Sequence, residues 1–321
     1  MRRIYFRFPR RGKVPKHPFR WFGKIFRRLK GSMFGPLYWG IAHRYDTPGL
    51  LFQRKSAVLG LALLLRSRIR FGEAYGFMFQ SMDSVRYFEF GTIWEFLSTG
   101  GGTISRYLDV SSPRLFPLIL LDEFPIPIAD IVNPDGKDLE TTMAVMGAAG
   151  LSDRCRFHGK TIDDLDFSPG TFDLVTSISV IEHIPDGGDR KAVERIWNLL
   201  RPGGRLYLSV PCAREPFEEF MDLNEYGILA PDEQGFVFGW TCYDATLVRD
   251  RIFAVTGEPA RFAVFGEKVA GSFFRNRAEK LGNPDYPFWK EPYMMGREYG
   301  HFRSIEELPG IGIIVMEFLK R

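Results

Sequence analysis

Strand-like and helix-like segments alternate through the middle of this chain. Segments that read as strands lie at 106–110, 126–132, 154–158, 172–178 and 205–210, and the continuous apolar character of "LVTSI" and "LYLSV" in the last two is typical of buried central strands. Segments with apolar residues at helical spacing lie between them, at 113–123, 136–150 and 187–200. This alternation predicts a parallel sheet with helices on both faces, because parallel strands need crossover connections and are buried on both sides.

The two ends of the chain have different patterns. Residues 46–103 read as helices, and three glycines at 100–102 separate them from the first strand. Near the other end, "YDATLVRDRIFAVTG" predicts a helix, and "RFAVFGE" and "GIGIIVMEFLK" predict strands. The connector between these last two strands, 268–311, is too long for a hairpin turn, so we expect a functional insertion there.

Charge is distributed unevenly along the chain. The first 30 residues carry twelve Lys and Arg, and the first acidic residue is Asp46. Since the whole chain has 43 basic and 39 acidic side chains, the remainder has 31 basic and 39 acidic. The protein is therefore an acidic body with a basic arm, which argues against a nucleic-acid-binding core.

Large apolar side chains in the basic arm fall at helical spacing. They are Phe19, Phe22, Phe26 and Leu29, with Trp21 and Ile25 beside them. Such a helix suits an anionic membrane surface, where rings enter the headgroup region and cations meet phosphates. Two alternatives stay open: the arm packs on the protein's own body, or it grips RNA or another polyanion.

Cysteine usage and hydropathy favour a reducing compartment. Cys155, Cys212 and Cys242 are far apart and form no CxxC pair, which argues against a disulfide framework and against a metal site. The apolar run 57–65 is too short to span a bilayer and too far along the chain for a signal peptide. We expect a cytoplasmic protein, peripheral at the inner face of the membrane if the arm binds lipid.

Polar residues follow the predicted strands. In open α/β sheets ligands bind at this carboxyl edge, near the point where strand order reverses. The candidates at the ends of the first four strands are Asp109, Ser111, Ser112, Asp130, Ile162, Asp163, Ser177, Ser179, Glu182 and His183.

Two phrases in the sequence resemble motifs of a known family. "FDLVTSISVIEHIPD" at 172–186 and "NLLRPGGRLYLSVP" at 198–211 are similar to the fourth- and fifth-strand motifs of class I S-adenosylmethionine-dependent methyltransferases. The resemblance covers roughly residues 104–212. It implies S-adenosyl-L-methionine as cofactor and an α/β, Rossmann-like, mostly parallel seven-stranded sheet with helices on both faces.

This resemblance also implies a domain organisation. We expect a basic aromatic arm at 1–45, a helical segment at 46–103, and a Rossmann-like methyltransferase domain at 104–321 that contains the 268–311 insertion. The arm and the helical segment together form a helical and basic N-terminal extension.

The resemblance assigns cofactor roles to the strand ends. The turn with Asp109, Ser111 and Ser112 would approach the amino-acid end of the cofactor. Asp130 would accept hydrogen bonds from both ribose hydroxyls, which suits an ionised carboxylate. Around the adenine and the methionine arm, the implied neighbours are Ile162, Asp163, Ser177 and Ser179.

The first turn departs from the family pattern. The family usually has Gly-x-Gly here, and this chain has Ser111-Ser112-Pro113. Serine is small, and its hydroxyl could bond the cofactor's carboxylate directly. The open alternatives are a variant cofactor site, and a degenerate site in a non-catalytic binding or scaffold protein at a membrane surface.

Glu182 and His183 are the catalytic candidates, because they would lie where the methyl group and the acceptor meet. The expected reaction is methyl transfer to an oxygen, with nitrogen as second choice. The motifs do not identify the acceptor. We expect the insertion to line the acceptor side through Tyr286, Phe288, Trp289 and Tyr293. Such rings suit a glycan or lipid-linked saccharide.

Overall fold

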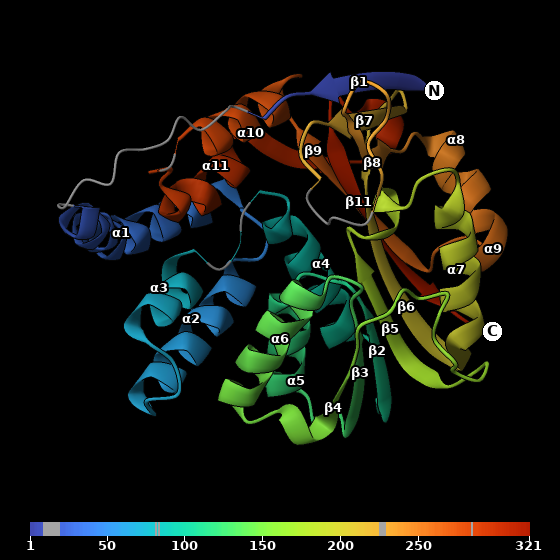
Figure 1. Cartoon of the computed structure of the whole chain (residues 1–321), viewed down its shortest axis with the longest axis horizontal. Helices are drawn as coiled ribbons and strands as arrows, with labels where there is room; N and C mark the ends of the chain where they lie inside the picture. Colours follow the sequence, from blue (N-terminus) through green and yellow to red (C-terminus); the bar gives the residue numbers. More distant parts are fainter. Residues whose placement is uncertain (9–19, 81, 83, 225–228, 284) are drawn as a thin grey trace.

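An eight-stranded sheet forms the centre of the molecule. The computed structural model describes residues 1–321 apart from 9–19, 81, 83, 225–228 and 284. The strands of the central sheet are β2 (Arg106–Val110), β3 (Ile128–Val132), β4 (Cys155–His158), β5 (Phe172–Ile178), β6 (Leu200–Cys212), β9 (Arg261–Glu267), β10 (Tyr299–Phe302) and β11 (Gly312–Leu319). They lie in the order β10-β9-β11-β6-β5-β2-β3-β4 (Figure 1).

The parallel half of this sheet runs from β6 to β4. The pairs β5–β6, β2–β5, β2–β3 and β3–β4 are all parallel. The strands predicted at 106–110 and 172–178 are confirmed to the residue, and the other three differ only in where they begin or end. The predicted α/β fold with a mostly parallel, Rossmann-like sheet is confirmed.

The central sheet has one strand more than the seven predicted. The extra strand, β10, comes from the 268–311 insertion and pairs antiparallel with the edge strand β9. Its four residues, Tyr-Gly-His-Phe, show no alternation of apolar and polar positions that would predict a strand. Pairing with an existing edge is what makes this short segment extended.

Helices cover both faces of the sheet. Their bounds are α1 Arg20–Ala42, α2 Leu50–Leu65, α3 Phe71–Phe79, α4 Arg86–Thr99, α5 Leu115–Glu123, α6 Gly136–Ala149, α7 Gly188–Leu199, α8 Ala245–Val248, α9 Ala254–Thr256, α10 Ser272–Gly282 and α11 Glu291–Glu298. α4, α5 and α6 lie on one face, and α7, α8 and α9 on the other (Figure 1). The predicted helices at 113–123, 136–150 and 187–200 are confirmed within two residues at each end.

Two apolar layers hold the helices to the sheet. Successive residues of a strand point to opposite faces, so Tyr107 joins the layer that contains Phe88 and Phe116. Its neighbour Leu108 joins the other layer, with Ile196 of α7. The sheet is thus buried on both sides, as its continuous apolar strands predicted.

A separate three-stranded sheet includes the first strand of the chain. It consists of β1 (Arg2–Phe6), β7 (Phe217–Met221) and β8 (Val237–Cys242), with β1 parallel to β7. The Arg277 guanidinium lies 4.3 Å from the ring centre of Phe6 and holds β1 against α10. This part of the basic arm therefore packs on the protein's own body. Phe19 and the side chains of Trp21 and Phe22 lie outside the described part of the chain.

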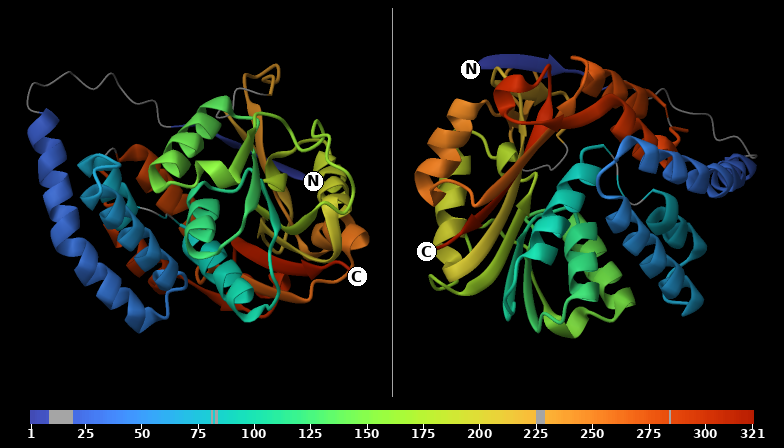
Figure 2. Two further views of the ribbon diagram at one scale, coloured as in Figure 1. Left: turned by 90° about the horizontal axis from the view of Figure 1, so that it is seen from below. Right: turned by 180° about the vertical axis from the view of Figure 1, so that it is seen from behind.

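The helices α1, α2 and α3 form a layer at one end of the molecule, beyond α4 to α6 (Figure 2). α1 packs against the insertion, where the Trp289 ring stacks on Phe34 at 5.6 Å. A turn of 3₁₀-helix, η5 (Phe288–Lys290), carries Trp289. The insertion therefore joins this helical layer to the sheet domain.

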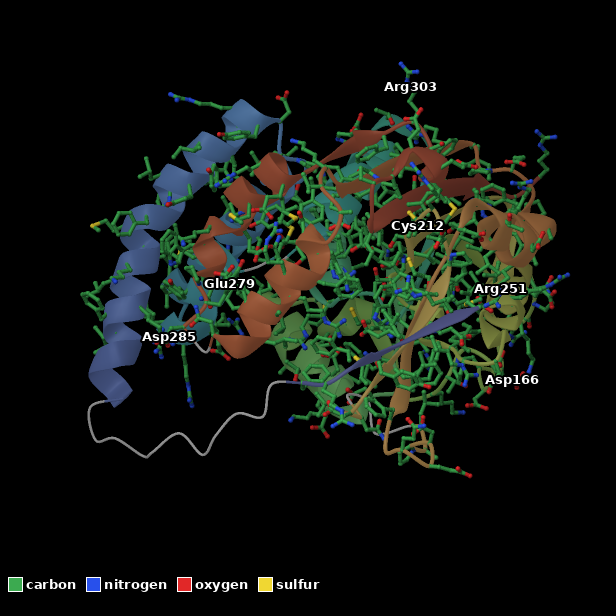
Figure 3. The ribbon with its side chains drawn as sticks, turned by 90° about the horizontal axis from the view of Figure 1, so that it is seen from above. Asp166, Cys212, Arg251, Glu279, Asp285 and Arg303 are labelled. Carbon is green, nitrogen blue, oxygen red and sulfur yellow. The ribbon has the colours of Figure 1, made fainter. Side chains whose placement is uncertain are left out.

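All three cysteine thiols are free. Cys212 lies fully buried in β6, inside the molecule (Figure 3), and Cys242 is equally buried in β8. Burial raises the pKa of the Cys155 thiol to about 11. These thiols are therefore protonated at neutral pH and serve as packing groups.

Candidate functional site

The strand order reverses between β2 and β5, and this is where an open α/β sheet offers a binding crevice. The chain leaves β2 at Val110 and enters a turn formed by Ser111 and Ser112. The Ser112 hydroxyl accepts a hydrogen bond from the Ile178 backbone N–H at 3.2 Å. The two strand ends on either side of the reversal are thus tied together by one serine.

Ser111 adopts a backbone conformation that favours glycine. Its φ is +53°, in the left-handed region, although it carries a side chain. Its backbone N–H and its hydroxyl both donate to the Val132 carbonyl oxygen, at 2.8 Å and 3.1 Å. These two bonds hold the strained turn in the path that a glycine would follow. The Ser111 hydroxyl only donates in this turn, whereas the Ser112 hydroxyl accepts once, so each retains acceptor capacity for a ligand.

Asp109 is buried beneath this turn. Its carboxylate accepts hydrogen bonds from the Thr176 hydroxyl at 2.7 Å, the Tyr107 hydroxyl at 3.1 Å and the Ser112 backbone N–H at 3.2 Å. Burial raises its pKa to about 6, although these bonds favour the charged form. In this structure, Asp109 braces the turn from below.

Asp130, the predicted ribose ligand, has partners within the protein. It lies inside β3, fully buried, two residues before the carboxyl end of the strand. Its carboxylate accepts from the Arg106 guanidinium at 3.2 Å and lies 2.9 Å from Nε2 of His158. The predicted strand 126–132 also ends at Val132, so the end of the strand is as expected; the contacts of the carboxylate with Arg106 and His158 are what the sequence did not show.

Asn133 is the polar side chain that follows β3 directly. Its backbone N–H donates to the His158 carbonyl oxygen, and its side-chain amide donates to Asp138 at 2.9 Å. Its amide oxygen accepts from the Asp135 backbone N–H. Asp135 in turn caps α6 by accepting from the backbone N–H groups of Lys137 and Asp138. Asn133 therefore sits at the carboxyl edge where Asp130 was expected.

The two residues predicted near adenine differ in exposure. Ile162 is buried in the apolar layer beside α7. Asp163 is exposed and lies 3.4 Å from the Lys191 ammonium. Both follow β4 in the chain, as predicted.

Ser177 and Ser179 lie at the end of β5. The Ser177 hydroxyl is buried, with no hydrogen-bond partner among the described residues. Ser179 has a φ of +49°, and its hydroxyl donates to Glu89 at 2.6 Å. The edge of β5 thus combines an unpartnered hydroxyl with a second strained serine.

Glu182 and His183 lie in one turn of 3₁₀-helix that follows β5 (η3, Ile181–His183) and border the same pocket. The pocket has a volume of about 210 Å³. The other side chains on its wall are those of Ser84, Val85, Arg86, Ser179, Pro211, Trp240, Phe273, Ile311 and Ile313. The sequence therefore brought the two predicted catalytic residues to one site.

Burial shifts the pKa of both residues toward the neutral form. The pKa of Glu182 is raised to about 8, mainly by desolvation, and one of its carboxyl oxygens has no hydrogen-bond partner among the described residues. The pKa of His183 is lowered to about 4 by desolvation, although a bond to the Gly239 carbonyl oxygen opposes this. That carbonyl lies 2.6 Å from Nδ1 of His183. Since a carbonyl only accepts, Nδ1 carries the proton and Nε2 carries the lone pair.

Glu89 is a site residue that the sequence did not reveal. It belongs to α4 and is fully buried, yet it accepts from the Ser179 and Ser209 hydroxyls at 2.6 Å each. Arg86, one turn earlier, donates to it at 2.5 Å and also lines the pocket. A glutamate in "SVRYFEF" gives no sign of this role, because only packing of α4 on the sheet brings it to the ends of β5 and β6.

The insertion reaches the pocket through different residues than predicted. Tyr286, Phe288, Trp289 and Tyr293 are absent from its wall. Trp289 and Tyr293 instead pack against Tyr38 of α1. The reason is that the part of the insertion around Trp289 and Tyr293 packs against α1, whereas Phe273 and Ile311, near its two ends, lie at the pocket.

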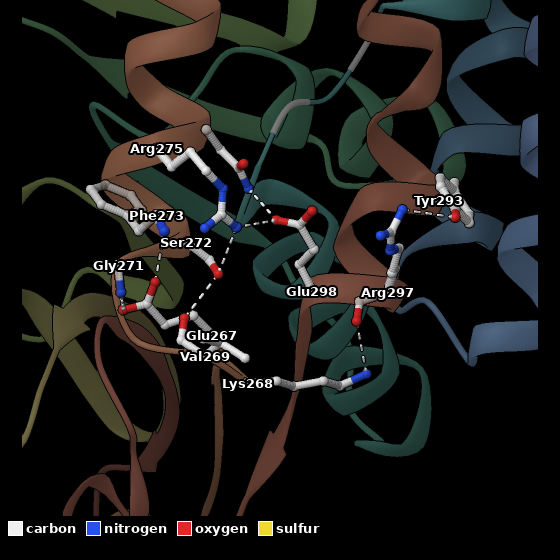
Figure 4. A network of polar contacts seen from close by, with 11 residues as sticks. Glu267, Lys268, Val269, Gly271, Ser272, Phe273, Arg275, Tyr293, Arg297 and Glu298 are labelled. Atoms are coloured by element: carbon white, nitrogen blue, oxygen red, sulfur yellow. Dashed lines mark hydrogen bonds and ion pairs between the residues drawn. The ribbon is translucent and has the colours of Figure 1, made fainter.

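Phe273 and Ile311 are the insertion residues on the pocket wall. Figure 4 shows how Phe273 is held: the Glu267 carboxylate accepts from the backbone N–H groups of Gly271 and Phe273. The same carboxylate accepts from the Ile311 N–H at 2.8 Å. One buried acid at the end of β9 thus fixes both ends of the insertion beside the pocket.

The small sheet supplies the opposite wall through Trp240. Its indole N–H donates to Glu219 at 3.1 Å, and Arg277 binds both oxygens of the same carboxylate. Its ring centre lies 6.1 Å from that of Phe273. Two fixed aromatic rings therefore face the pocket that contains Glu182 and His183.

Comparison with known proteins identifies part of this arrangement. Residues 132–208 match a family model described as "Methyltransferase domain". A rice protein (Oryza sativa subsp. japonica), "Probable tocopherol O-methyltransferase, chloroplastic", is 34% identical over 88 residues. That match covers 27% of this chain and 24% of the rice protein.

Two solved structures are similar in outline. The [4+2]-cyclase SpnF is 16% identical, with a TM-score of 0.47, over 72% of this chain and 79% of its own. The 1,6-didemethyltoxoflavin-N1-methyltransferase of Burkholderia thailandensis, solved with S-adenosylhomocysteine, is 13% identical, with a TM-score of 0.46, over 75% and 80%. Among the described residues, no helix has the length and apolar character to cross a membrane.

Proposed function

We propose that the protein is a class I S-adenosylmethionine-dependent methyltransferase, because residues 132–208 match a methyltransferase-domain model and contain the first of the two motifs that predicted this family. The observation that carries the proposal is the pocket at the ends of β5 and β6. There the matched segment places Glu182 and His183 together, beside the strand-order reversal. The name of the rice relative supports oxygen over nitrogen as the methylated atom.

The residues at the carboxyl edge fit this cofactor in part. The left-handed Ser111 keeps the close backbone approach that glycine normally allows, and the buried Ser177 hydroxyl offers a polar group to a ligand. We assign the ribose side to Asn133 in place of Asp130, because Asn133 lies at the edge. When bound, S-adenosylmethionine supplies a methyl group on a sulfonium sulfur, already activated for transfer.

His183 is the residue we assign to the acceptor's proton. With Nδ1–H donating to Gly239, Nε2 is the atom that accepts the proton from an acceptor hydroxyl. A pKa of about 4 keeps the ring neutral at pH 7 but makes it a weak base. Proton removal therefore accompanies methyl transfer and does not precede it, and alignment of the acceptor supplies most of the acceleration.

Glu182 has a different role from His183. With a pKa of about 8, its carboxyl group is protonated at neutral pH and donates a hydrogen bond. A neutral donor beside a neutral base orients an acceptor hydroxyl without adding charge to the pocket. The two residues are thus assigned to orientation and to proton acceptance, respectively.

The pocket walls support a ring-shaped acceptor. Trp240 and Phe273 offer ring faces, and Pro211, Ile311 and Ile313 are apolar. A sugar ring stacks on such faces through its C–H groups, and its hydroxyl would reach the polar side of the pocket. We propose a glycan or lipid-linked saccharide as the acceptor. We also propose that the N-terminal part of the chain contacts an anionic membrane surface, and that the protein is cytoplasmic.

A second candidate is a cofactor-free binding protein. Two observations favour it: the Ser111 and Ser112 hydroxyls already bond the backbone, and Asp130 is committed to Arg106 and His158. Calorimetric titration of the full chain with S-adenosylhomocysteine separates the two. We expect binding at micromolar concentrations, and a well-folded protein that gives no heat at millimolar ligand would exclude the enzyme.

A further inference from the structure

A second pocket lies far from the strand ends, inside the helical layer. It has a volume of about 430 Å³, opens to solvent and is lined by residues of α1, α2, α3 and η5. Its walls are mainly apolar, with Trp39, Ala57, Phe79 and Trp289 among them. The volume is within the range of ligand sites, roughly 300–1,000 Å³. We propose that this pocket binds one acyl chain of an anionic phospholipid when the helical layer rests on a membrane.

One polar group on the wall indicates that an occupant completes this pocket. Gln53 is 6% exposed, and its amide oxygen is buried with no hydrogen-bond partner among the described residues. Buried polar atoms in proteins are nearly always bonded. The glycerol headgroup of phosphatidylglycerol carries hydroxyls that can donate to this oxygen. Arg54, the next residue and exposed, also borders the pocket and suits the phosphate.

The outer surfaces of the same helices are apolar. On α1 the exposed apolar side chains are Phe26, Leu29, Met33 and Leu37, and on α2 they are Leu51, Val58, Leu61 and Leu65. Each is 46% to 77% exposed. Both sets recur at helical spacing, so each helix presents an apolar stripe. Figure 2 shows α1 and α2 together at one end of the molecule.

The charge of the helical layer favours an anionic membrane as the source of the phospholipid that occupies the pocket. Between residues 20 and 72 the chain has eleven Lys and Arg and one acidic residue, Asp46. Apolar stripes with cations beside them match a bilayer with negative headgroups, because rings and aliphatic groups enter the interface while cations meet phosphates. When these helices rest on the bilayer, the pocket between them lies next to the phospholipids that would supply the acyl chain. This inference does not depend on methyl transfer.

Quenching of tryptophan fluorescence tests the proposal. The full chain is mixed with vesicles of phosphatidylglycerol whose acyl chains carry bromine, and separately with brominated phosphatidylcholine. We expect the protein to pellet with the first vesicles and lose fluorescence from Trp39 and Trp289. The Trp39→Phe/Trp289→Phe double variant should lose most of that quenching. With the neutral phosphatidylcholine vesicles, the protein should neither pellet nor lose tryptophan fluorescence.

A pair of neighbouring substitutions separates the pocket from the surface. Ala57→Phe fills the pocket, so the variant should still pellet but lose at least half of the quenching. Val58→Phe adds the same side chain one residue later on the exposed face, and should be quenched like wild type. Arg54→Gln should raise the phosphatidylglycerol concentration for half-maximal quenching several-fold.

Thermal melting and far-ultraviolet circular dichroism show whether each variant stays folded. If Ala57→Phe fails to fold, Arg54→Gln alone decides. The proposal is overturned if wild type does not bind anionic vesicles. It is also overturned if the folded Ala57→Phe variant is quenched as strongly as Val58→Phe, or if Arg54→Gln matches wild type.

Discussion

The raised pKa of Glu182 makes a quantitative prediction about stability and pH. Its carboxyl has an ordinary pKa of 4.5, which burial raises to about 8 in the folded protein. Below pH 4.5 the group is protonated in both states. Above it, the unfolded chain ionises while the folded chain holds its proton, so stability falls until pH 8. The full effect is on the order of 5 kcal/mol, at about 1.36 kcal/mol per pH unit.

Glu182→Gln removes this titration while keeping the shape of the neutral acid. The variant should therefore gain about 4 kcal/mol relative to wild type between pH 5 and pH 8. The free energies of unfolding are measured by urea titration of both proteins at half-unit intervals of pH. The raised pKa of Asp109, about 6, acts in both proteins and cancels in the difference. Parallel curves for the two proteins would refute the assignment of a protonated Glu182.

Four further outcomes follow from the site. His183→Ala should lower kcat by about 10²–10⁴-fold with little change in KM, measured by steady-state methylation once an acceptor is found; a rise in KM alone would contradict proton acceptance by His183. Glu89→Ala should cost about 1.5–3 kcal/mol in urea unfolding, because it removes the buried carboxylate that accepts from the Ser179 and Ser209 hydroxyls and from the partly exposed Arg86, and Glu89→Gln should cost less. Ser112→Ala should cost about 1–3 kcal/mol, since it leaves the Ile178 N–H unpaired, yet keep affinity for S-adenosylhomocysteine in calorimetry. Asp130→Asn should destabilise the fold without changing that affinity, whereas Asn133→Ala should weaken it about tenfold; the reverse pattern would restore the ribose role to Asp130.

The sequence alone was sufficient for the parallel half of the fold. Strands buried on both faces are rich in apolar residues and alternate here with helix-like segments, so 106–110 and 172–178 could be located without a structure. The motif at 172–186 begins with one of these strands, and Glu182 and His183 follow a few residues after that strand ends. Local order therefore placed both residues at the carboxyl edge, and the family match covers the same segment.

Contacts between distant parts of the chain decided the rest. Glu89 reaches Ser179 and Ser209 across 90 and 120 residues, and no local pattern marks a glutamate for such a contact. Trp289 of the insertion packs against Phe34 and Tyr38 of α1. The insertion residues that line the pocket are therefore Phe273 and Ile311 and not the predicted aromatic residues.

The position of Asp130 shows the same division between local pattern and tertiary structure. The sequence predicts the strand that contains it, and the structure ends this strand at the predicted residue, Val132. The groups that its carboxylate meets, Arg106 and His158, come from the neighbouring strands β2 and β4 and depend on how the strands pair. Periodicity determines which segments become strands, because it reflects burial. Pairing and packing across the chain determine where each strand stops and therefore which side chains face the site.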